Sequence, residues 1–514
     1  MTDIFSELFT LPTFLALVFG TVGGLIIGAL PGLSATMGIA LLIPFSYTLD
    51  TVPAMIMLVS IYCSAVYGGS FSAILIRTPG TPASAATSID GYPLTLQGKG
   101  RQALGVSTTA SCIGGIISGV ALLFIAPQLV KVALLFSAPE YFLVTLFGLT
   151  IVGSLSGDDF LKGILSAVFG LLIGCIGMNA TPYARYSFGN VNLMGGIYLV
   201  PAMIGLFSIP QVITLAQSRV TARNRDEAMA QAAELKRMIR NAVQQKGRFW
   251  PDWKTMKTIL PAITTASLYG LLVGIMPGAG GDIGSWFGYN CARNLSKHKE
   301  LFGKGALDGI AGSEAGNNAV CGGALIPALT LGIPGSGAAA VILGALMLQG
   351  FAPGTALFTT YADMTYALFI GFIAANILMG VAGWAFSRYA VKFAAMPNGI
   401  LIPVIISLSI IGSFSMRNNL FDVLVMLVFG IIGHFMKKCG VPAAPAVLGL
   451  ILGPMCERNL INSFQMAKSS IVVYFISRPL CDVLIMAIVA TVAVPIVKNS
   501  LKRKKGRKNG RGSA

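Results

Sequence analysis

Charged residues are scarce in this 514-residue chain, and that scarcity decides its structural class. Only 11% of the residues are Asp, Glu, Lys or Arg, whereas 55% are hydrophobic and the mean hydropathy is +0.77. Soluble domains carry about 25% charged residues, so this chain lacks the polar surface that water requires. The composition predicts an all-α polytopic membrane protein, because helices satisfy their own backbone hydrogen bonds in lipid.

Clustered cysteines and histidines are also missing. The eight cysteines are scattered without a CxxC pair, and the two histidines, His298 and His434, are far apart in sequence. Zinc sites and disulfide frameworks need such clusters, so we expect neither, and we expect no cofactor. The N-terminal MTDIFSELF has no Lys or Arg. It therefore differs from a secretory signal, and we expect the first span to be retained.

Positive charge is abundant but confined to a few segments. The net charge is +17, and much of it lies in a connector, residues 219–257, and in the C-terminal tail from Lys498. Basic segments that flank apolar spans indicate the cytoplasmic side of a membrane, so the charge does not indicate nucleic-acid binding. Within the connector, RDEAMAQAAELKRMIRNAVQQ predicts a charged amphipathic helix.

Pro-Gly breaks inside apolar runs are the most specific feature of the sequence. GALPGLSA around Pro31 matches GIMPGAGG around Pro277, and RTPGTPAS around Pro79 matches GIPGSGAA around Pro334. Seven matched segments occur in one order at offsets of roughly 244 to 260 residues, which indicates a duplicated sequence. A single Pro-Gly pair is often only a packing kink in a membrane helix, so it is the recurrence that favours function.

Charge placement predicts that the two copies have opposite orientations. The loop with Lys99 and Arg101 is basic in the first copy, and its counterpart LQGFAPG is uncharged. Conversely, RNLSKHKELFGKG is basic where its first-copy counterpart SYTLDTVP has no Lys or Arg. We therefore expect two inverted-topology repeats with broken or re-entrant helices and about 10–14 membrane segments. The predicted order is a first repeat over 1–216, a cytoplasmic linker helix over 217–256, a second repeat over 257–478, an extra C-terminal transmembrane helix over 479–497 and a basic cytoplasmic tail over 498–514.

Helices that break within a membrane predict a binding site. Unwound backbone finds no partners in lipid, so it must line a cavity, and inverted repeats with such breaks are typical of secondary transporters. Half-helix N-termini favour anions, whereas freed carbonyl groups suit a cation such as Na⁺. We expect a carboxylate substrate to be bound by Ser34, Arg77, Thr78, Gly80, Thr81, Ser84, Gly280, Asn317, Gly335 and Ser336. For the cation, we expect Thr78, Pro79, Asp282, Glu314, Asn318, Pro334 and Gly335.

Some of these residues also have a purely structural interpretation. Ser34, Thr81, Ser336 and Asp282 stand where they would cap the helix that follows each break, and Pro82 suits a first helical position.

The few charges within apolar segments leave alternatives open. Arg77 would either bind a carboxylate, pair with Asp90 or extend to the membrane surface. Glu314 would neutralise a cation, carry a proton or make a structural hydrogen bond. Glu140, Asp158 and Asp159 lie near span ends, where we expect them to be solvated.

Three long segments carry a family resemblance. They are GALPGLSATMGIALLIPFSY, YGGSFSAILIRTPGTPASAATSIDGYPL and EAGNNAVCGGALIPALTLGIPGSGAAAVILGALMLQG. They resemble the large membrane subunit of tripartite tricarboxylate transporters, the TctA family, and the resemblance covers nearly the whole chain. The family's motifs fall on Pro31, Gly32, Pro79, Gly80, Pro277, Gly278, Pro334 and Gly335, and on Glu314, Asn317 and Asn318, with Gly316 in place of an expected alanine.

The resemblance also implies a function and partners. Such a protein would be a multi-pass importer in the bacterial inner membrane, coupled to Na⁺ or H⁺. It would work with a small four-helix membrane subunit and a periplasmic solute-binding protein. Citrate, another tricarboxylate, a dicarboxylate or an aromatic acid all stay open as the substrate.

Energetics favour coupled transport over the alternatives. Importing a trivalent anion into an inside-negative cell costs about 7 kcal/mol per 100 mV, so cations must enter with it. We expect alternating access by an elevator-like shift of the paired broken helices. An anion channel should instead show a continuous polar lining. An intramembrane enzyme would need Asp282 to act with Asp363, but the glycine spacing around Asp282 differs from an aspartyl protease motif.

Overall fold

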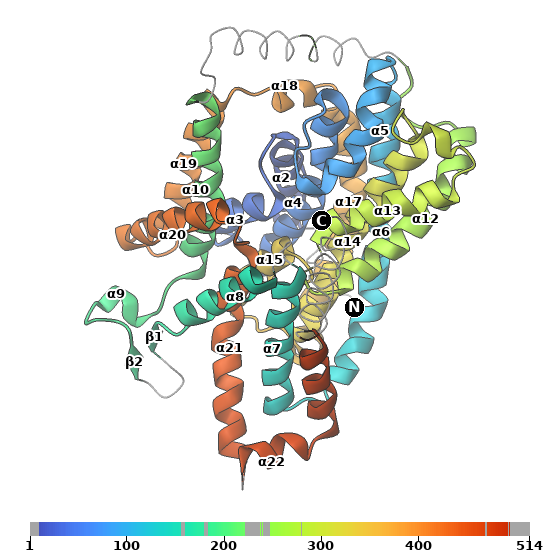
Figure 1. The fold of residues 1–514 in the computed structure, drawn as a ribbon. Helices are drawn as coiled ribbons and strands as arrows, with labels where there is room; N and C mark the ends of the chain where they lie inside the picture. Colours follow the sequence, from blue (N-terminus) through green and yellow to red (C-terminus); the bar gives the residue numbers. More distant parts are fainter. Residues whose placement is uncertain are drawn as a thin grey trace, which may run out of the picture. The chain divides into compact units, whose positions relative to one another are not determined.

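The computed structural model describes residues 10–155, 160–178, 183–220, 237, 239, 247–278, 280–467, 470–491 and 493, and these residues are mostly helical (Figure 1). Eight of the described helices are long and apolar enough to cross a membrane, which confirms the predicted class. They are α2 (Leu11–Ala29), α4 (Thr51–Ile76), α6 (Gly100–Ala133), α10 (Leu199–Val220), α12 (Trp253–Ile275), α17 (Ala362–Phe386), α19 (Asn398–Ser415) and α20 (Leu420–Lys438).

The chain forms two compact units, and each draws on both halves of the sequence. The first unit comprises Met1–Val130 and Val200–Phe435, and the second comprises Lys131–Leu199 and Met436–Ala514. The second unit contains α7 (Ala138–Leu155), α8 (Phe160–Gly174), the antiparallel strands β1 (Gly177–Met178) and β2 (Ala184–Arg185), α9 (Val191–Met194), α21 (Ala444–Met466), α22 (Ile471–Ile476) and an apolar helix, Pro479–Thr491. Most of the predicted linker helix and all of the basic tail lie outside the described residues.

Four long helices of the first unit end where the sequence predicts breaks. In each case a short irregular segment leads into another helix. The pairs are α2 with α3 (Ala35–Ser46), α4 with the 3₁₀ turn η1 (Pro82–Ser84) and α5 (Ala85–Leu96), α12 with α13 (Gly280–Leu295), and α14 (Leu307–Leu331) with α15 (Gly337–Leu348). The unit also contains η2 (Lys299–Leu301), α16 (Thr355–Phe358) and α18 (Ala390–Ala394).

The unwound backbone of two breaks is bound in the same way. The Gly80 N–H donates to the Gly69 carbonyl of α4 at 3.3 Å, and the Gly335 N–H donates to the Ala324 carbonyl of α14 at 3.3 Å. Gly80 corresponds to Gly335 in the sequence match, and Gly69 corresponds to Ala324. Each broken segment therefore folds back against the helix that precedes it.

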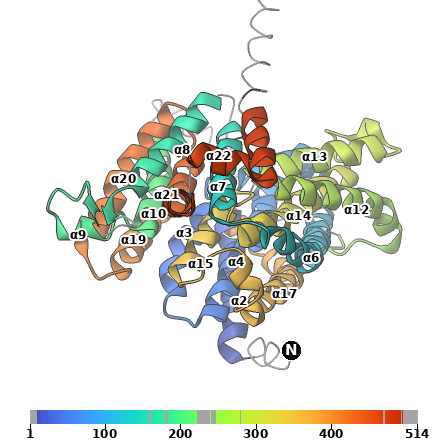
Figure 2. The ribbon, with the colours of Figure 1, turned by 90° about the horizontal axis from the view of Figure 1, so that it is seen from below.

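Close helix packing also matches between the two halves of the first unit. Gly28 of α2 lies so near α4 that a Cβ there would overlap the Ala65 carbonyl oxygen. At the equivalent place, a Cβ on Gly274 of α12 would lie 2.7 Å from the Val320 carbonyl oxygen of α14. Figure 2 shows α2 beside α4 and α12 beside α14. The small glycine surface lets each pair of backbones make contact.

A second set of equivalent helices shows matching pairs as well. Within the second unit, Gly170 of α8 packs on Ala446 of α21, and within the first unit Gly430 of α20 packs on Ile209 of α10. In the sequence match, α8 corresponds to α20 and α21 corresponds to α10. The packed pair α8–α21 of the second unit is therefore equivalent to the packed pair α20–α10 of the first unit. These contacts are those that a duplicated fold would make, whereas the opposite orientation of the copies stays a prediction.

Replacing Gly28 with alanine tests the close contact of α2 with α4. We expect Gly28→Ala to lower the free energy of unfolding by about 1–3 kcal/mol, because the new methyl group overlaps the α4 backbone. The control is Gly23→Ala on the same helix, where the one described atom within 4 Å of a Cβ would be Leu42 Cδ1 at 3.9 Å. Thermal unfolding of the purified protein measures both, and equal effects of the two changes would contradict this packing.

Candidate functional site

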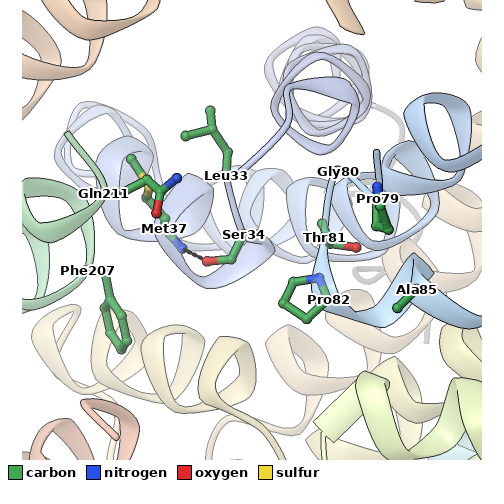
Figure 3. Close-up of a pocket in the computed structure, with 11 residues that line it drawn as sticks. Leu33, Ser34, Met37, Pro79, Gly80, Thr81, Pro82, Ala85, Phe207 and Gln211 are labelled. Atoms are coloured by element: carbon green, nitrogen blue, oxygen red, sulfur yellow. Dashed lines mark hydrogen bonds between the residues drawn. The ribbon is translucent and has the colours of Figure 1, made fainter. Parts of the chain in front are cut away.

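A cavity of about 500 Å³ lies in the first unit, between two of the helix breaks (Figure 3). Pockets for small molecules usually have volumes of roughly 300–1,000 Å³, so its size suits an organic ligand. Its walls are the turn between α2 and α3, the segment from α4 through η1 to α5, and one face of α10. The lining residues are Gly32, Leu33, Ser34, Met37, Pro79, Gly80, Thr81, Pro82, Ala85, Phe207 and Gln211.

Ser34 begins α3 at the cavity wall. Its backbone is extended and its Oγ accepts a hydrogen bond from the Met37 N–H at 3.2 Å, so it caps the helix as the sequence predicts. This cap fixes the direction of α3, and the remaining N–H groups of the first turn have no partner within the helix. The positive end of the α3 dipole therefore lies at the cavity.

Thr81 and Pro82 begin the second helical segment at the cavity. Thr81 has extended backbone and precedes η1, and Pro82 takes the first helical position, as predicted. The Thr81 hydroxyl does not bind a backbone N–H, however; it lies 3.1 Å from the Ser84 hydroxyl, and both side chains are buried. The capping prediction is thus correct in position but wrong in the side-chain contact, because the Thr81 hydroxyl pairs with the Ser84 hydroxyl instead.

The second pair of breaks is closed by direct contacts. Ser336 caps α15 by accepting the Ala339 N–H at 3.1 Å, and its hydroxyl lies 2.8 Å from the Tyr62 hydroxyl of α4. The Gly280 N–H donates to the Gly335 carbonyl at 3.2 Å, which joins the third break to the fourth. These residues therefore lie away from the cavity lining, and Ser336 has the capping role that the sequence predicts.

Asp282 does not cap α13. The helix begins at Gly280, whose φ of 69° turns the chain before Asp282 is reached, so Asp282 lies in the first turn with an exposed side chain. The N-cap prediction for Asp282 is wrong for that reason. Asp363 is also exposed, in the first turn of α17, and no hydrogen bond joins the two among the described residues. An aspartyl dyad would instead be expected to share a hydrogen bond in a secluded site.

Asn317 is fully buried, and its side chain is unsatisfied. Neither its amide nitrogen nor its oxygen has a hydrogen-bond partner among the described residues. The Asn317 amide, on α14, lies beside Gly281 at the start of α13, because a Cβ on Gly281 would be 2.6 Å from the Asn317 side-chain oxygen. The same Cβ would be 3.4 Å from the Ala83 Cβ of η1. Leaving such a group without a partner costs about 1–3 kcal/mol, so a ligand or water is expected there.

Asn318 and Glu314 lie on the same buried helix, α14. The Asn318 amide nitrogen donates to the Glu314 carbonyl at 3.3 Å, while its side-chain oxygen has no partner among the described residues. The Glu314 carboxyl group accepts hydrogen bonds from Thr87 Oγ1 of α5 at 2.5 Å and from Ser111 Oγ of α6 at 3.0 Å. Glu314 thus makes structural hydrogen bonds, one of its three predicted roles.

Asp90 of α5 holds the start of α14. Its Oδ1 accepts three backbone N–H groups, from Gly303 at 2.7 Å, Gly305 at 2.9 Å and Ala306 at 3.0 Å. Its Oδ2 accepts the Tyr289 hydroxyl at 2.9 Å. The alternative that pairs Asp90 with Arg77 is therefore wrong, because this carboxylate is already bound by four donors. A local sequence signal existed, since the glycines of LFGKGA suit such a nest of N–H groups.

Arg77 ends α4 in a left-handed conformation. Its φ is 57°, whereas the equivalent end of α14 has glycine, Gly332, with φ 74°. Its side chain is exposed, and the guanidinium lies 6.0 Å from the centre of the Tyr92 ring. Residues other than glycine lose about 1–2 kcal/mol in this conformation, so arginine here is not chosen for backbone stability.

Thr78 is not one of the residues that line the cavity. Its side chain is exposed, and its hydroxyl donates to the Ile76 carbonyl at 3.3 Å. The structure thus brings together four predicted site residues at the cavity: Ser34, Pro79, Gly80 and Thr81. The sequence gives no comparable signal for Phe207 and Gln211, since they reach the cavity only through the packing of α10.

The expectation that the Glu140 side chain is solvated is wrong. Within the second unit it is fully buried and forms an ion pair with Arg478. It also accepts the Ser137 N–H at 2.9 Å at the start of α7. A buried charge needs such partners, and the sequence does not show that Arg478 folds back to supply one. Asp158 and Asp159 lie outside the described residues.

Replacing Arg77 tests the strain at the end of α4. We expect Arg77→Gly to be more stable than Arg77→Ala by about 1 kcal/mol, because only glycine adopts this conformation without steric cost. Both changes remove the side-chain contact with Tyr92, so that contact cancels in the comparison. Chemical or thermal unfolding measures the difference, and an alanine variant as stable as the glycine variant would refute the strain.

Replacing Asp90 tests the attachment of α5 to α14. Asp90→Ala leaves three N–H groups of residues 303–306 without their acceptor, so we expect trypsin to cleave at the exposed Lys299 and Lys304 at least tenfold faster. Asp363→Ala, at an exposed aspartate, is the control. Unchanged cleavage in Asp90→Ala would show that the carboxylate does not hold this loop.

Comparisons with known proteins agree with this architecture. The family model described as the tripartite tricarboxylate transporter TctA family matches residues 14–448. The chain is 33% identical over 479 residues to an uncharacterized 52.8 kDa protein in the TAR-I ttuC' 3'region of Agrobacterium vitis, covering 93% of this chain and 92% of that protein. It is 35% identical over 211 residues to an uncharacterized protein in the TAR-II ttuC' 3'region of the same organism, covering 41% of this chain and 87% of that protein. No solved structure matches the chain. The chain belongs to the tripartite tricarboxylate transporter TctA family.

Proposed function

We propose that the protein is a secondary active importer of organic carboxylates, driven by a cation gradient. Membership of the TctA family makes it a subunit of a tripartite transport system with partner subunits. The observation that carries the finer proposal is the cavity lined by two helix breaks, with Ser34 at the start of α3 and Thr81 at the start of the η1–α5 segment. This arrangement presents two positive helix ends to one small-molecule site.

A carboxylate fits the chemistry of these two helix starts. Each helix end is equivalent to roughly half a positive charge, and the first-turn N–H groups can donate hydrogen bonds to carboxylate oxygens. The hydroxyl groups of Ser34 and Thr81 add polar side chains to the cavity lining at these two helix starts. The α5 helix has twelve residues and α3 has twelve, so both are long enough to carry a dipole.

Asn317 and Asn318 support a coupling-cation site near the break of α12. Their side-chain oxygens are buried without partners among the described residues, and oxygen ligands suit Na⁺. The Gly335 carbonyl, another predicted ligand, already accepts the Gly280 N–H. We therefore assign the cation first to Asn317 and Asn318, with Glu314 available to carry a proton if H⁺ is the coupling ion.

Coupling is a requirement of the membrane potential. Each negative charge moved into the cell costs about 2.3 kcal/mol per 100 mV. Substrate binding cannot supply this free energy, because binding and release cancel over a complete transport cycle. We propose that the two halves are inverted repeats and that the broken segments move together, because Asp90 joins α5 to the start of α14. The partners proposed are a small four-helix membrane subunit and a periplasmic solute-binding protein, in the bacterial inner membrane.

Uptake into proteoliposomes tests this function. Labelled citrate, succinate and benzoate are supplied outside, with both partner subunits present, and the Na⁺ gradient, pH gradient and voltage are set separately. Accumulation that needs a Na⁺ or proton gradient supports the importer. Equal flux in both directions without any gradient would instead favour an anion channel.

The Asn317 side chain gives the sharpest variant for this proposal. Because its amide lacks partners among the described residues, Asn317→Ala should lower coupled uptake at least tenfold while leaving the unfolding temperature unchanged or raised. Asn376→Ala is the control: its oxygen also lacks a partner among the described residues, but its amide nitrogen donates to the Phe372 carbonyl at 2.8 Å, so its loss should lower stability. Normal uptake by Asn317→Ala would exclude Asn317 from the site.

A further inference from the structure

If the proposed function is correct, the chemical character of the residues that line the cavity determines which carboxylates it can bind. Six of the eleven lining residues have apolar side chains, and the polar side chains are those of Ser34, Thr81 and Gln211. None of the described lining residues is Lys, Arg or His. The apolar members are Leu33, Met37, Pro79, Pro82, Ala85 and Phe207.

The positive potential of this cavity is limited. It comes from two helix starts, which together amount to roughly one positive charge. Arg77 is near in sequence, but it is not a lining residue and its side chain is exposed. Three carboxylates would have to leave water for a site with about one compensating charge, and burying charge without a partner is costly. One or two carboxylates would match the two helix starts.

The α10 wall supplies the other half of the recognition. Phe207 and Gln211 are four residues apart on this helix, so they share one face, and Figure 3 shows them across the cavity from Thr81 and Pro82. The Gln211 amide lies close to Gly32, where any larger residue would collide with it. Phe207 offers an apolar ring to a ligand body, and the Gln211 amide can donate to a carboxylate or accept from a hydroxyl.

We infer that the cavity selects a mono- or dicarboxylate with an apolar or aromatic body, and that Phe207 and Gln211 are its specificity-determining residues. The charged end of the ligand lies at the starts of α3 and of the η1–α5 segment. The apolar body lies between Phe207 and the Pro82 side, where it removes apolar surface of both ligand and wall from water. A tricarboxylate would leave at least one charge facing this apolar wall.

Direct binding of four probes tests the substrate class. Benzoate, terephthalate, succinate and citrate are titrated by calorimetry into the full chain in lipid nanodiscs, at fixed Na⁺ and pH. We expect benzoate or terephthalate to bind at least tenfold more tightly than citrate. Citrate binding more tightly than the other three would overturn the inference while leaving the carboxylate importer intact. Binding of none of the four would count against the proposed function itself.

Variants of the α10 wall separate its two roles. Phe207→Ala should weaken binding of aromatic acids about tenfold and change succinate binding by less than threefold, because only an aromatic body contacts the ring. The matched control is Phe124→Ala on α6, a phenylalanine that is 67% exposed and not part of the cavity lining. Equal loss for aromatic acids and succinate would indicate a general structural effect and overturn the role of Phe207.

A charge change at Gln211 tests its contact with the ligand. Gln211→Glu keeps the size of the side chain but adds a negative charge, so it should weaken all carboxylate binding at least tenfold at neutral pH. Gln211→Asn should be closer to the native protein, since it keeps the amide. Gln217→Glu, on the exposed side of the same helix, controls for added charge. Unchanged affinity in Gln211→Glu would remove Gln211 from the binding site.

Discussion

Backbone groups that leave a helix inside a membrane must find partners within the protein, and the first unit is organised around that constraint. At two breaks the freed N–H of Gly80 or Gly335 returns to the preceding helix, to Gly69 or Ala324. At the others, Ser34 caps α3 and the Gly280 N–H binds the Gly335 carbonyl. Among the described residues, both side-chain polar atoms of Asn317 remain without a partner beside the third break, where a ligand or water can satisfy them.

Small residues make this satisfaction possible. Gly80 and Gly335 lie directly against the backbones of α2 and α12, where a Cβ would overlap the carbonyl oxygens of Gly28 and Gly274. Such contacts position the broken segments without charged side chains. The charged residues of the first unit can therefore make other contacts, such as those that join distant elements. Asp90 is an example, because it joins an element of the first half of the chain to the second half.

The sequence predicts those parts of the site that depend on local chemistry. The four breaks and the caps at Ser34 and Ser336 follow from Pro, Gly and Ser within a few residues of each other, and the structure has them. Contacts between distant segments could not be predicted in this way. The donors that bind Asp90, the burial of Glu140 by Arg478, and the reach of Phe207 and Gln211 into the cavity all depend on packing. The prediction that Asp282 caps α13 was wrong for a local reason, because the helix already begins at Gly280, which adopts a positive φ.

One labelling experiment tests most directly whether the broken helices form a carboxylate site that opens to both sides of the membrane. The eight native cysteines are replaced, and a single cysteine is placed at Ala85 in the cavity lining. A membrane-impermeant thiol reagent is then applied from either side of oriented proteoliposomes, with and without a transported carboxylate. We expect labelling from each side of the membrane and slower labelling when the carboxylate is bound. Labelling from one side only, at a rate that the carboxylate does not change, would contradict it.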